Sequence, residues 1–457
     1  MPARSSTDAV QEPSSPAATV PLATDPPAFD PPATSLLAAP AAGPATGAGS
    51  VWASREYRAL WAASSWSLVG DQLARVALTV LLYQQTGSAF WASVGGAVTL
   101  LAPVVGGLLL STVGDRRPRR QVLVACDVVS AVLIAGMTIP GLPLPVMVVL
   151  LGLAFALYGP FNAARMALLR DVFPDNQRSS KATGNNAMTF RVGILAGALI
   201  GGAAVAVVGV RGALLLDAST FVVSAILVRL WVADRPAPRP AHRPQSTPAG
   251  QPAAGPAAEP VEPVVSGLRL VFTDPVLRTS ALYAWMAVFI IAPSGVAAPY
   301  AAAHGGGATL LGLVLAVQGI GMLAGTFVVT RQPFTTQQQW LVPGAVLSCL
   351  PLVGTATDPG VPTVMVLWVL SGIGSAYMIV AQTVFMSAVP DERRAELGGK
   401  VSSLLLGVQG AGMLAVAALA EAIGPADAVA VFGAAGTIAA LALAPAGRRH
   451  AATPLPQ

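Results

Sequence analysis

The chain has 457 residues, of which 54% are hydrophobic and only 10% are charged. Because soluble domains carry about 25% charged residues, this composition excludes an ordinary soluble protein and indicates an integral membrane protein. The 26 Lys and Arg residues outnumber the 21 Asp and Glu residues, but membrane proteins collect basic residues in cytoplasmic loops, so we expect no nucleic-acid partner. The two cysteines, Cys126 and Cys349, lie far apart in apolar runs and the three histidines stand alone, so the sequence predicts no disulfide framework, metal site or cofactor.

Three polar stretches divide the chain. Residues 1–50 are rich in Pro, Ala, Ser and Thr and hold no run able to cross a bilayer, which predicts a disordered cytoplasmic tail rather than a signal peptide. A similar stretch at 233–263 predicts a cytoplasmic linker, and residues 447–457 form a second tail. The linker separates two hydrophobic parts, at 51–232 and 264–446, each of which we expect to be a helical bundle.

Each hydrophobic part contains six apolar segments of about the 20 residues that a membrane-crossing helix needs. The segments are residues 59–84, 90–112, 121–140, 144–169, 185–209 and 212–232, followed by 277–301, 307–330, 338–356, 361–388, 399–422 and 426–445. The sequence therefore predicts an all-α integral membrane protein with twelve transmembrane helices.

Lys and Arg residues set the expected orientation. With both termini in the cytoplasm, the loops after helices 2, 4, 6, 8 and 10 hold most of the basic residues, whereas the outer loops offer Arg211 alone. The use of Arg over Lys and the abundance of Ala, Gly and Pro are typical of bacteria with GC-rich DNA, so we expect a multi-pass protein of the inner (plasma) membrane.

The two hydrophobic parts are related by an internal repeat. "VFPDNQRSS" at 172–180 and "AVPDERRAE" at 388–396 share Pro-Asp at an offset of 216 residues, and the same offset carries Asp115 onto Arg331. Six spans is an even number, so both copies enter the membrane from the same side, as parallel repeats do.

The stretch "STVGDRRPRR" at 111–120 resembles the loop between helices 2 and 3 of the major facilitator superfamily. Asp115, Arg116, Arg119 and Arg120 match that pattern, although Ser111 and Pro118 replace its two glycines. "SLVGDQLARVALTVLLYQQTGSA", "GPFNAARMALLRDVFP", "LLLDASTFVVSAIL" and "GLRLVFTDPVLR" look like the drug, macrolide and siderophore exporter branch. The resemblance implies the major facilitator fold, with two six-helix repeats, and a monomeric secondary transporter.

The resemblance also implies a conformational latch on the cytoplasmic side. In the family the acid of this loop lies at the start of helix 11 and against a basic residue at the end of helix 4; here the partners are the region of Gly399 and Arg165 or Arg170. The alternative is that the four arginines of this loop, Arg116, Arg117, Arg119 and Arg120, only anchor the topology. Asp115 is poorly explained by that alternative, because acids contribute little to topology.

Charged residues inside the predicted spans need a partner or a function, because a charge at the bilayer centre is costly. Asp71 lies near the middle of helix 1, and Arg75 follows one turn later on the same face, so we expect the two to pair. In one hypothesis Asp71 is the proton-coupling residue: burial favours the neutral form of its carboxyl group, Arg75 favours the charged form, and opening of the site to either side changes which effect is larger. The other makes the pair purely structural.

Three further charges lie in the first predicted bundle. Arg191, about two turns into helix 5, either receives an anionic group or extends to the membrane surface as a structural residue. Asp127 and Asp217 are nearer the surfaces, on helices that the family places outside the cavity, and we expect structural roles for both.

The second predicted bundle offers amides and aromatic rings in place of charges. We expect five of these side chains to line a cavity that suits an amphiphilic organic molecule, including a cationic one; tolerant core positions would give the same pattern. They are Gln318, Gln382, Gln409, Trp285 and Tyr377.

Small residues at intervals of four predict close helix packing on helix 5, at Gly193, Gly197 and Gly201. Antiporters of the family often carry Gly-Pro in this helix, but Ala198 takes the position of that Pro, which removes part of the case for antiport.

The sequence therefore predicts a transporter that exports a small amphiphilic molecule against inward proton flow, with the lipid bilayer and protons as its other partners. An uptake symporter on the same fold is the first alternative, and a non-transporting sensor or interaction protein is the second. The sequence has no phosphate-binding loop, nucleophile elbow or His-Glu-x-x-His motif, so we expect neither an ATP-driven pump nor an enzyme.

Overall fold

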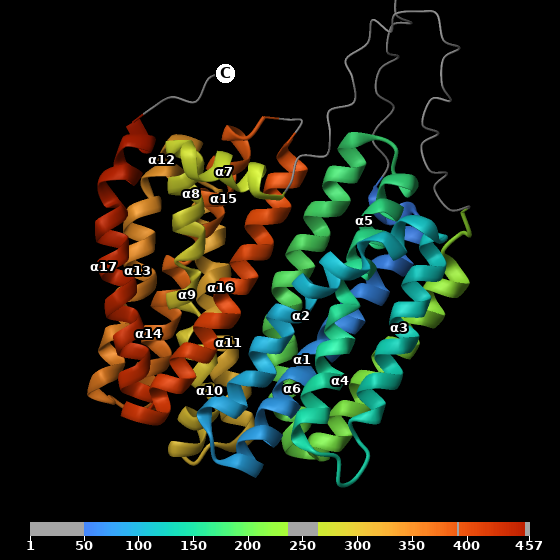
Figure 1. The fold of residues 1–457 in the computed structure, drawn as a ribbon, viewed down its shortest axis with the longest axis horizontal. Coiled ribbons are helices and arrows are strands. Elements are labelled where there is room, and N and C mark those ends of the chain that lie inside the picture. The colour runs from blue at the N-terminus through green and yellow to red at the C-terminus, as the bar shows by residue number, and fades with distance from the viewer. Residues whose placement is uncertain (1–49, 236–263, 391–392, 453–457) are drawn as a thin grey trace, which may run out of the picture. The chain divides into compact units, whose positions relative to one another are not determined.

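The computed structural model describes residues 50–235, 264–390 and 393–452, which form helices joined by short connections (Figure 1). The described residues belong to one compact unit, which begins at Ser50. The predicted N-terminal tail and nearly all of the predicted linker fall outside the described residues.

The first group of helices follows a short turn at Val51–Ala53. We call it the N-terminal half: α1 (Arg55–Thr86), α2 (Ala89–Arg116), α3 (Arg119–Gly136), α4 (Leu144–Ala156), α5 (Tyr158–Val172) and α6 (Asn176–Trp231). α4 and α5 follow one another as a single crossing. α6 holds two crossings, because Gly209 has a non-helical backbone with φ 71° and ψ 175°.

The second group is the C-terminal half, and several of its crossings consist of consecutive short helices. Its helices are α7 (Val264–Thr273), α8 (Pro275–Trp285), α9 (Ala287–Ile290), α10 (Ala292–Ala303), α11 (Gly307–Thr330), α12 (Phe334–Gln339), α13 (Leu341–Val353), α14 (Val361–Gly374), α15 (Tyr377–Ala388), α16 (Arg394–Ile423) and α17 (Pro425–Ala452). Figure 1 shows α1–α6 on one side and α7–α17 on the other.

The helices agree with the fold class that the sequence predicts. Within the described residues, nine helical stretches are long and apolar enough to cross a membrane, and one of them, Gln177–Trp231, is 55 residues long and is broken at Gly209. The more polar α1 and α3 supply two further crossings. The structure is therefore consistent with the predicted twelve helices.

Side-chain caps explain why several helices begin where they do. The hydroxyls of Ser54 and Ser88 accept hydrogen bonds from the backbone N–H groups of Tyr57 and Trp91, at the starts of α1 and α2. Asp274 accepts from two backbone N–H groups at the start of α8. Such caps satisfy N–H groups that have no partner within the helix.

The two ends of the bundle have different chemistry. The connections between crossings 1–2, 3–4, 5–6, 7–8, 9–10 and 11–12 each contain a glycine with positive φ, a conformation that glycine adopts without strain. We call this the glycine end; its positive-φ glycines are Gly87, Gly141, Gly209, Gly305, Gly307, Gly360 and Gly424. The opposite end carries Arg119, Arg120, Arg178, Arg235 and Arg331 and is called the arginine end.

The apolar core joins the two halves at the glycine end. The largest cluster of buried side chains combines Val80 and Val205 of the N-terminal half with Val296, Leu311 and Val416 of the C-terminal half. Its members lie in those parts of the helices that approach the glycine end. Among the described residues, the other clusters each belong to one half.

Polar contacts and close backbone approaches join the halves in the same region. Ser88 at the start of α2 donates a hydrogen bond to Glu421 at the end of α16, and the Ser93 hydroxyl donates to the Gly295 carbonyl. A Cβ atom on Gly202 would lie 2.8 Å from the Cα of Gly312 in α11. Only glycine permits such an approach, so these two positions fix how closely the halves meet.

Candidate functional site

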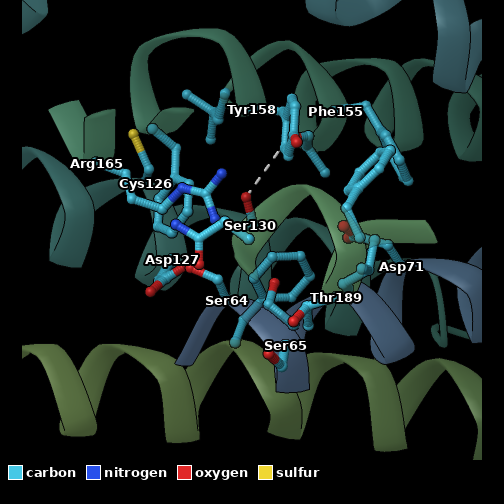
Figure 2. Close-up of a pocket in the computed structure, with 18 of the residues that line it drawn as sticks. Ser64, Ser65, Asp71, Cys126, Asp127, Ser130, Phe155, Tyr158, Arg165 and Thr189 are labelled. Carbon is cyan, nitrogen blue, oxygen red and sulfur yellow. Dashed lines mark hydrogen bonds between the residues drawn. The ribbon is translucent and has the colours of Figure 1, made fainter. Parts of the chain in front are cut away.

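The first candidate site is a pocket inside the N-terminal half, between α1, α3, α4, α5 and α6. Its cavity volume is about 60 Å³. We call it the acidic pocket, after Asp71 and Asp127 in its wall. Figure 2 shows Asp127, Cys126 and Arg165 on one side and Asp71 and Phe155 on the other. The polar lining also includes Ser64, Ser65, Ser67, Ser130, Tyr158, Asn186 and Thr189.

The backbone of α1 carries Asp71 close to a second acid. A Cβ atom on Gly70, the residue before Asp71, would lie 2.3 Å from Oδ1 of Asp217 and 2.2 Å from Oγ1 of Thr220. The glycine at this position therefore allows α1 and α6 to pack in direct contact. Asp217 is 0% exposed, and its Oδ2 atom has no hydrogen-bond partner among the described residues. A buried polar atom without a partner is unusual in folded proteins.

Asp127 enters the acidic pocket from α3. It is 2% exposed, and its Oδ2 atom accepts a hydrogen bond of 2.7 Å from the hydroxyl of Ser224 in α6. One turn later on α3, Ser130 donates to the Ala154 carbonyl at 3.5 Å, which is drawn in Figure 2. The pocket thus receives carboxyl groups from two helices, with a third acid next to it.

Arg165 supplies the positive charge of the acidic pocket. Its Nη2 donates to Oδ1 of Asn162 at 2.9 Å, while its buried Nε has no partner among the described residues. A cavity of this size holds a few water molecules, whereas a cavity that binds a benzene ring measures about 150 Å³. Acids and hydroxyls around so small a space suit the exchange of a proton better than the binding of an organic molecule.

The second candidate site lies between the two halves and is called the Arg191 pocket. Its volume is about 150 Å³, and Arg191 of α6 is the residue that the N-terminal half contributes to its wall. The C-terminal half contributes hydroxyls, one amide and a large apolar surface. These residues are Ser280, Ala281, Ala284, Met322, Thr326, Ser375, Met378, Ile379, Ala381, Gln382, Phe385, Met386, Gly398, Val401, Ser402 and Leu405.

One expectation about α1 needs correction. The sequence spacing predicts an ion pair between Asp71 and Arg75, but in the structure Nε of Arg75 donates to Oγ1 of Thr99 in α2 at 3.0 Å, and Nη2 donates to the same oxygen. No ion pair joins Asp71 and Arg75 in the described part of the chain. Positions four apart share a helix face, but the neighbouring helix decides which partner the side chain reaches.

Of the five polar or aromatic cavity candidates in the C-terminal half, one lines the Arg191 pocket, namely Gln382. Gln318 instead donates to the Ile290 carbonyl at 2.9 Å and to the hydroxyl of Ser371. Trp285 packs on Phe272, with ring centroids 5.7 Å apart. Tyr377 is 0% exposed in a core cluster, and Gln409 is partly buried on α16 away from both pockets. These four line neither of the two pockets, and their role in a substrate cavity stays a prediction.

Two arginines of the expected latch contact acids of their own half. Arg119 forms an ion pair with Asp171 at the end of α5, and Arg120 with Asp234 at 3.0 Å. Arg165 lies in the acidic pocket. The side chains of Asp115 and Arg116 fall outside the described residues, and a Cβ atom on Gly399 would meet no atom within 4 Å. The latch therefore remains a prediction.

The small residues of helix 5 pack as closely as their spacing predicts, and they pack on α1. Cβ atoms on Gly193, Gly197 and Gly201 would meet side-chain or backbone atoms of α1, the nearest of them at 2.5, 2.8 and 3.2 Å. The spacing of these glycines does not indicate that the next residue, Gly202, faces the other half. The sequence analysis also missed Asp127 as a residue of the acidic pocket, because its position on helix 3 indicated a structural role.

Comparisons with known proteins agree with this architecture. A family model described as Major Facilitator Superfamily matches residues 60–332. The chain is 26% identical over 375 residues to the "Multidrug efflux pump Tap" of Mycolicibacterium fortuitum; the match covers 78% of this chain and 87% of that protein.

Solved structures with a similar fold include two transporters from different groups. A POT family transporter in complex with a thioalcohol conjugated peptide is 13% identical, with a TM-score of 0.65 over 87% of this chain and 97% of that one. A bacterial homologue of the iron transporter ferroportin, in an inward-facing state, is 15% identical, with a TM-score of 0.61 over 87% of this chain and 99% of that one.

Proposed function

Because this chain belongs to the major facilitator superfamily, we propose that it is a secondary active transporter that exports a small amphiphilic organic molecule in exchange for protons. The observation that carries the proposal is the separation of two pockets. The acidic pocket inside the N-terminal half is small and carries two carboxyl groups, whereas the Arg191 pocket between the halves is larger and carries one charged group, that of Arg191. A proton and an organic substrate then have different sites, which one conformational change can couple.

Asp71 is the proposed proton site. The balance between a carboxyl group and a carboxylate depends on water and on neighbouring charges, so a movement that changes the surroundings of the acidic pocket changes how strongly Asp71 holds a proton. Asp127 shares the pocket, and Asp217 lies against the backbone of the preceding residue, Gly70. Movement of α1 against α3 and α6 would change the environment of all three carboxyl groups together.

The proposed cycle alternates access to the Arg191 pocket. The positive-inside rule places the arginine end and both termini in the cytoplasm. The halves share their core and their polar contacts at the glycine end, which supports an inward-facing state for the structure described above. Transport to the outside then requires the glycine end to open while the arginine end closes.

The latch belongs to the same cycle. Asp115 would stabilise the closed arginine end by contacts with the start of α16. We expect Asp115→Asn to leave membrane insertion unchanged and to slow transport severalfold, as measured by substrate flux in vesicles. Normal flux from a well-inserted variant would remove the latch from the mechanism.

Export is favoured over uptake by the 26% identity with a multidrug efflux pump. Uptake symport remains the second candidate, because the fold is also that of POT family transporters. The direction of substrate movement relative to the proton gradient separates the two.

The test uses inside-out membrane vesicles with a pH-sensitive dye and a panel of amphiphilic cations, acids, macrolides and siderophores. Release of protons from the lumen on addition of a compound to wild-type vesicles, but not to Asp71→Asn vesicles, would support proton-coupled export with Asp71 as its proton site. Equal responses from both would exclude Asp71 from coupling. Substrate uptake into whole cells that follows the proton gradient would instead establish symport.

A further inference from the structure

We infer that the Arg191 pocket selects organic acids, binding a carboxylate or another oxyanion at Arg191 and an apolar body against the C-terminal half. The inference rests on the proposed function, because it names the substrate class of a transport site. It begins from Arg191 itself, which is partly buried and has no hydrogen-bond or ion-pair partner within the described part of the chain.

Other arginines inside the N-terminal half differ from Arg191 in this respect. Arg75 donates to Thr99, and Arg165 donates to Asn162. At the arginine end, Arg119, Arg120 and Arg235 each pair with an acid of the same half. The fold therefore supplies partners for the neighbouring guanidinium groups and leaves that of Arg191 facing a cavity.

The walls of the pocket provide no counter-charge. Every lining residue from α8, α11, α14–α15 and α16 is apolar or neutral, so Arg191 is the one charged group among the described lining residues. A charge in a site of low polarity is unfavourable without a partner. An anionic ligand would supply that partner, whereas a cationic ligand would meet repulsion.

Guanidinium geometry narrows the ligand group. The planar fork of Arg donates two parallel hydrogen bonds to a carboxylate, sulfonate or phosphate oxygen pair. Thr326 adds a hydroxyl whose oxygen is buried without a partner among the described residues, and Gln382 adds an amide. These groups suit the oxygen atoms of an acid head group.

The apolar walls determine the rest of the ligand. Met322, Met378, Met386 and Phe385 line the pocket. Methionine side chains are flexible and polarizable, so they adapt to ligands of different shape. A cavity of about 150 Å³ accepts a group the size of a benzene ring. The expected substrate is therefore an acid group on an aromatic or similarly apolar body.

Binding to the purified full-length protein tests the inference without any need for transport. The probes are benzoate, methyl benzoate and benzylamine, which share one phenyl ring and differ in charge. The variants are Arg191→Gln and Arg191→Lys, with Arg229→Gln as the matched control, since Arg229 is exposed at the arginine end of α6. Thermal unfolding of each variant verifies that it is folded.

We expect the acid to bind wild type and the Arg229→Gln control equally, and the ester and amine to bind more weakly. Loss of a charge-assisted hydrogen-bonded pair costs about 10-fold to 100-fold in affinity, so Arg191→Gln should lose that factor for the acid alone, and Arg191→Lys should lose less. Equal binding of acid, ester and amine, unchanged acid binding by Arg191→Gln, or no saturable acid binding by wild type would each overturn the inference.

Failure here is distinct from failure of the proposed function. If proton release in vesicles depends on Asp71 but is triggered by cations or neutral compounds, the exporter stands and the acid preference is wrong. If acids bind through Arg191 but move without protons, the site stands and the coupling is wrong.

Discussion

The two halves repeat one six-helix plan, yet they differ sharply in what they bury. The N-terminal half holds acids and arginines within its crossings, including Asp71, Asp127, Asp217, Arg75 and Arg165. The crossings of the C-terminal half contain amides, hydroxyls, methionines and aromatic rings, and the sequence from Thr279 to Thr330 has no Asp, Glu, Lys or Arg at all. The two copies of the repeat therefore differ in the chemistry of their crossings: one contains charged groups, and the other contains neutral polar and flexible apolar side chains.

The largest expected effect comes from removing a charge of the N-terminal half. Asp71→Asn should reduce proton-driven flux by about 100-fold or more, a loss typical of a missing proton-transfer group. Substrate flux under an imposed pH gradient measures it. The matched control is Asp358→Asn in a connection of the C-terminal half, where φ is 42° and Asn is also tolerated. A control that loses as much flux as Asp71→Asn would break the comparison between the halves.

A steric change beside Asp71 should have the next largest effect. In Gly70→Ala the new Cβ would overlap Thr220 and Asp217, whereas Gly407→Ala on α16 meets no atom within 4 Å. We expect Gly70→Ala to lower the free energy of unfolding by about 1–3 kcal/mol. Thermal unfolding in detergent checks it, and equal melting temperatures for the two variants would mean that α1 and α6 separate easily.

Asp71 and Arg75 show which structural features could be predicted from the sequence and which could not. Apolar length and turn residues predict the spans well, because a segment must cross the hydrocarbon whatever its neighbours are. The partner of Arg75 was beyond this reasoning, since Thr99 lies 24 residues away on another helix. Asp71 was recognisable by its depth, while the meeting of Asp127, Arg165 and Asp71 in one pocket depends on how α1, α3 and α5 pack.

A polar group of the C-terminal half should matter for stability more than for coupling. Gln318→Leu removes hydrogen bonds to Ile290 and Ser371 and should cost about 0.5–1.5 kcal/mol of unfolding free energy. The control is Gln409→Leu, which changes a side chain with no such bond among the described residues. Proton-coupled flux by the Gln318→Leu variant, expressed per amount of folded protein, should equal that of wild type. Loss of this flux in a variant of normal stability would show that the amide takes part in transport.

The smallest effect is expected at Tyr377 in the core of the same half. Its hydroxyl is fully buried without a hydrogen-bond partner among the described residues. Because an unpaired buried hydroxyl is unfavourable, Tyr377→Phe should leave the melting temperature unchanged or slightly higher. A clear decrease would reveal a partner for the hydroxyl.

The shared core at the glycine end also has a thermal consequence. To open that end, the transporter must part apolar surfaces such as those of Val205 and Leu311, which belong to the core cluster shared by the two halves. Exposure of apolar surface to water raises the heat capacity, and burial of such surface becomes less favourable on cooling. Low temperature should therefore shift the population towards opening at the glycine end, and the logarithm of the turnover rate should curve when plotted against inverse temperature.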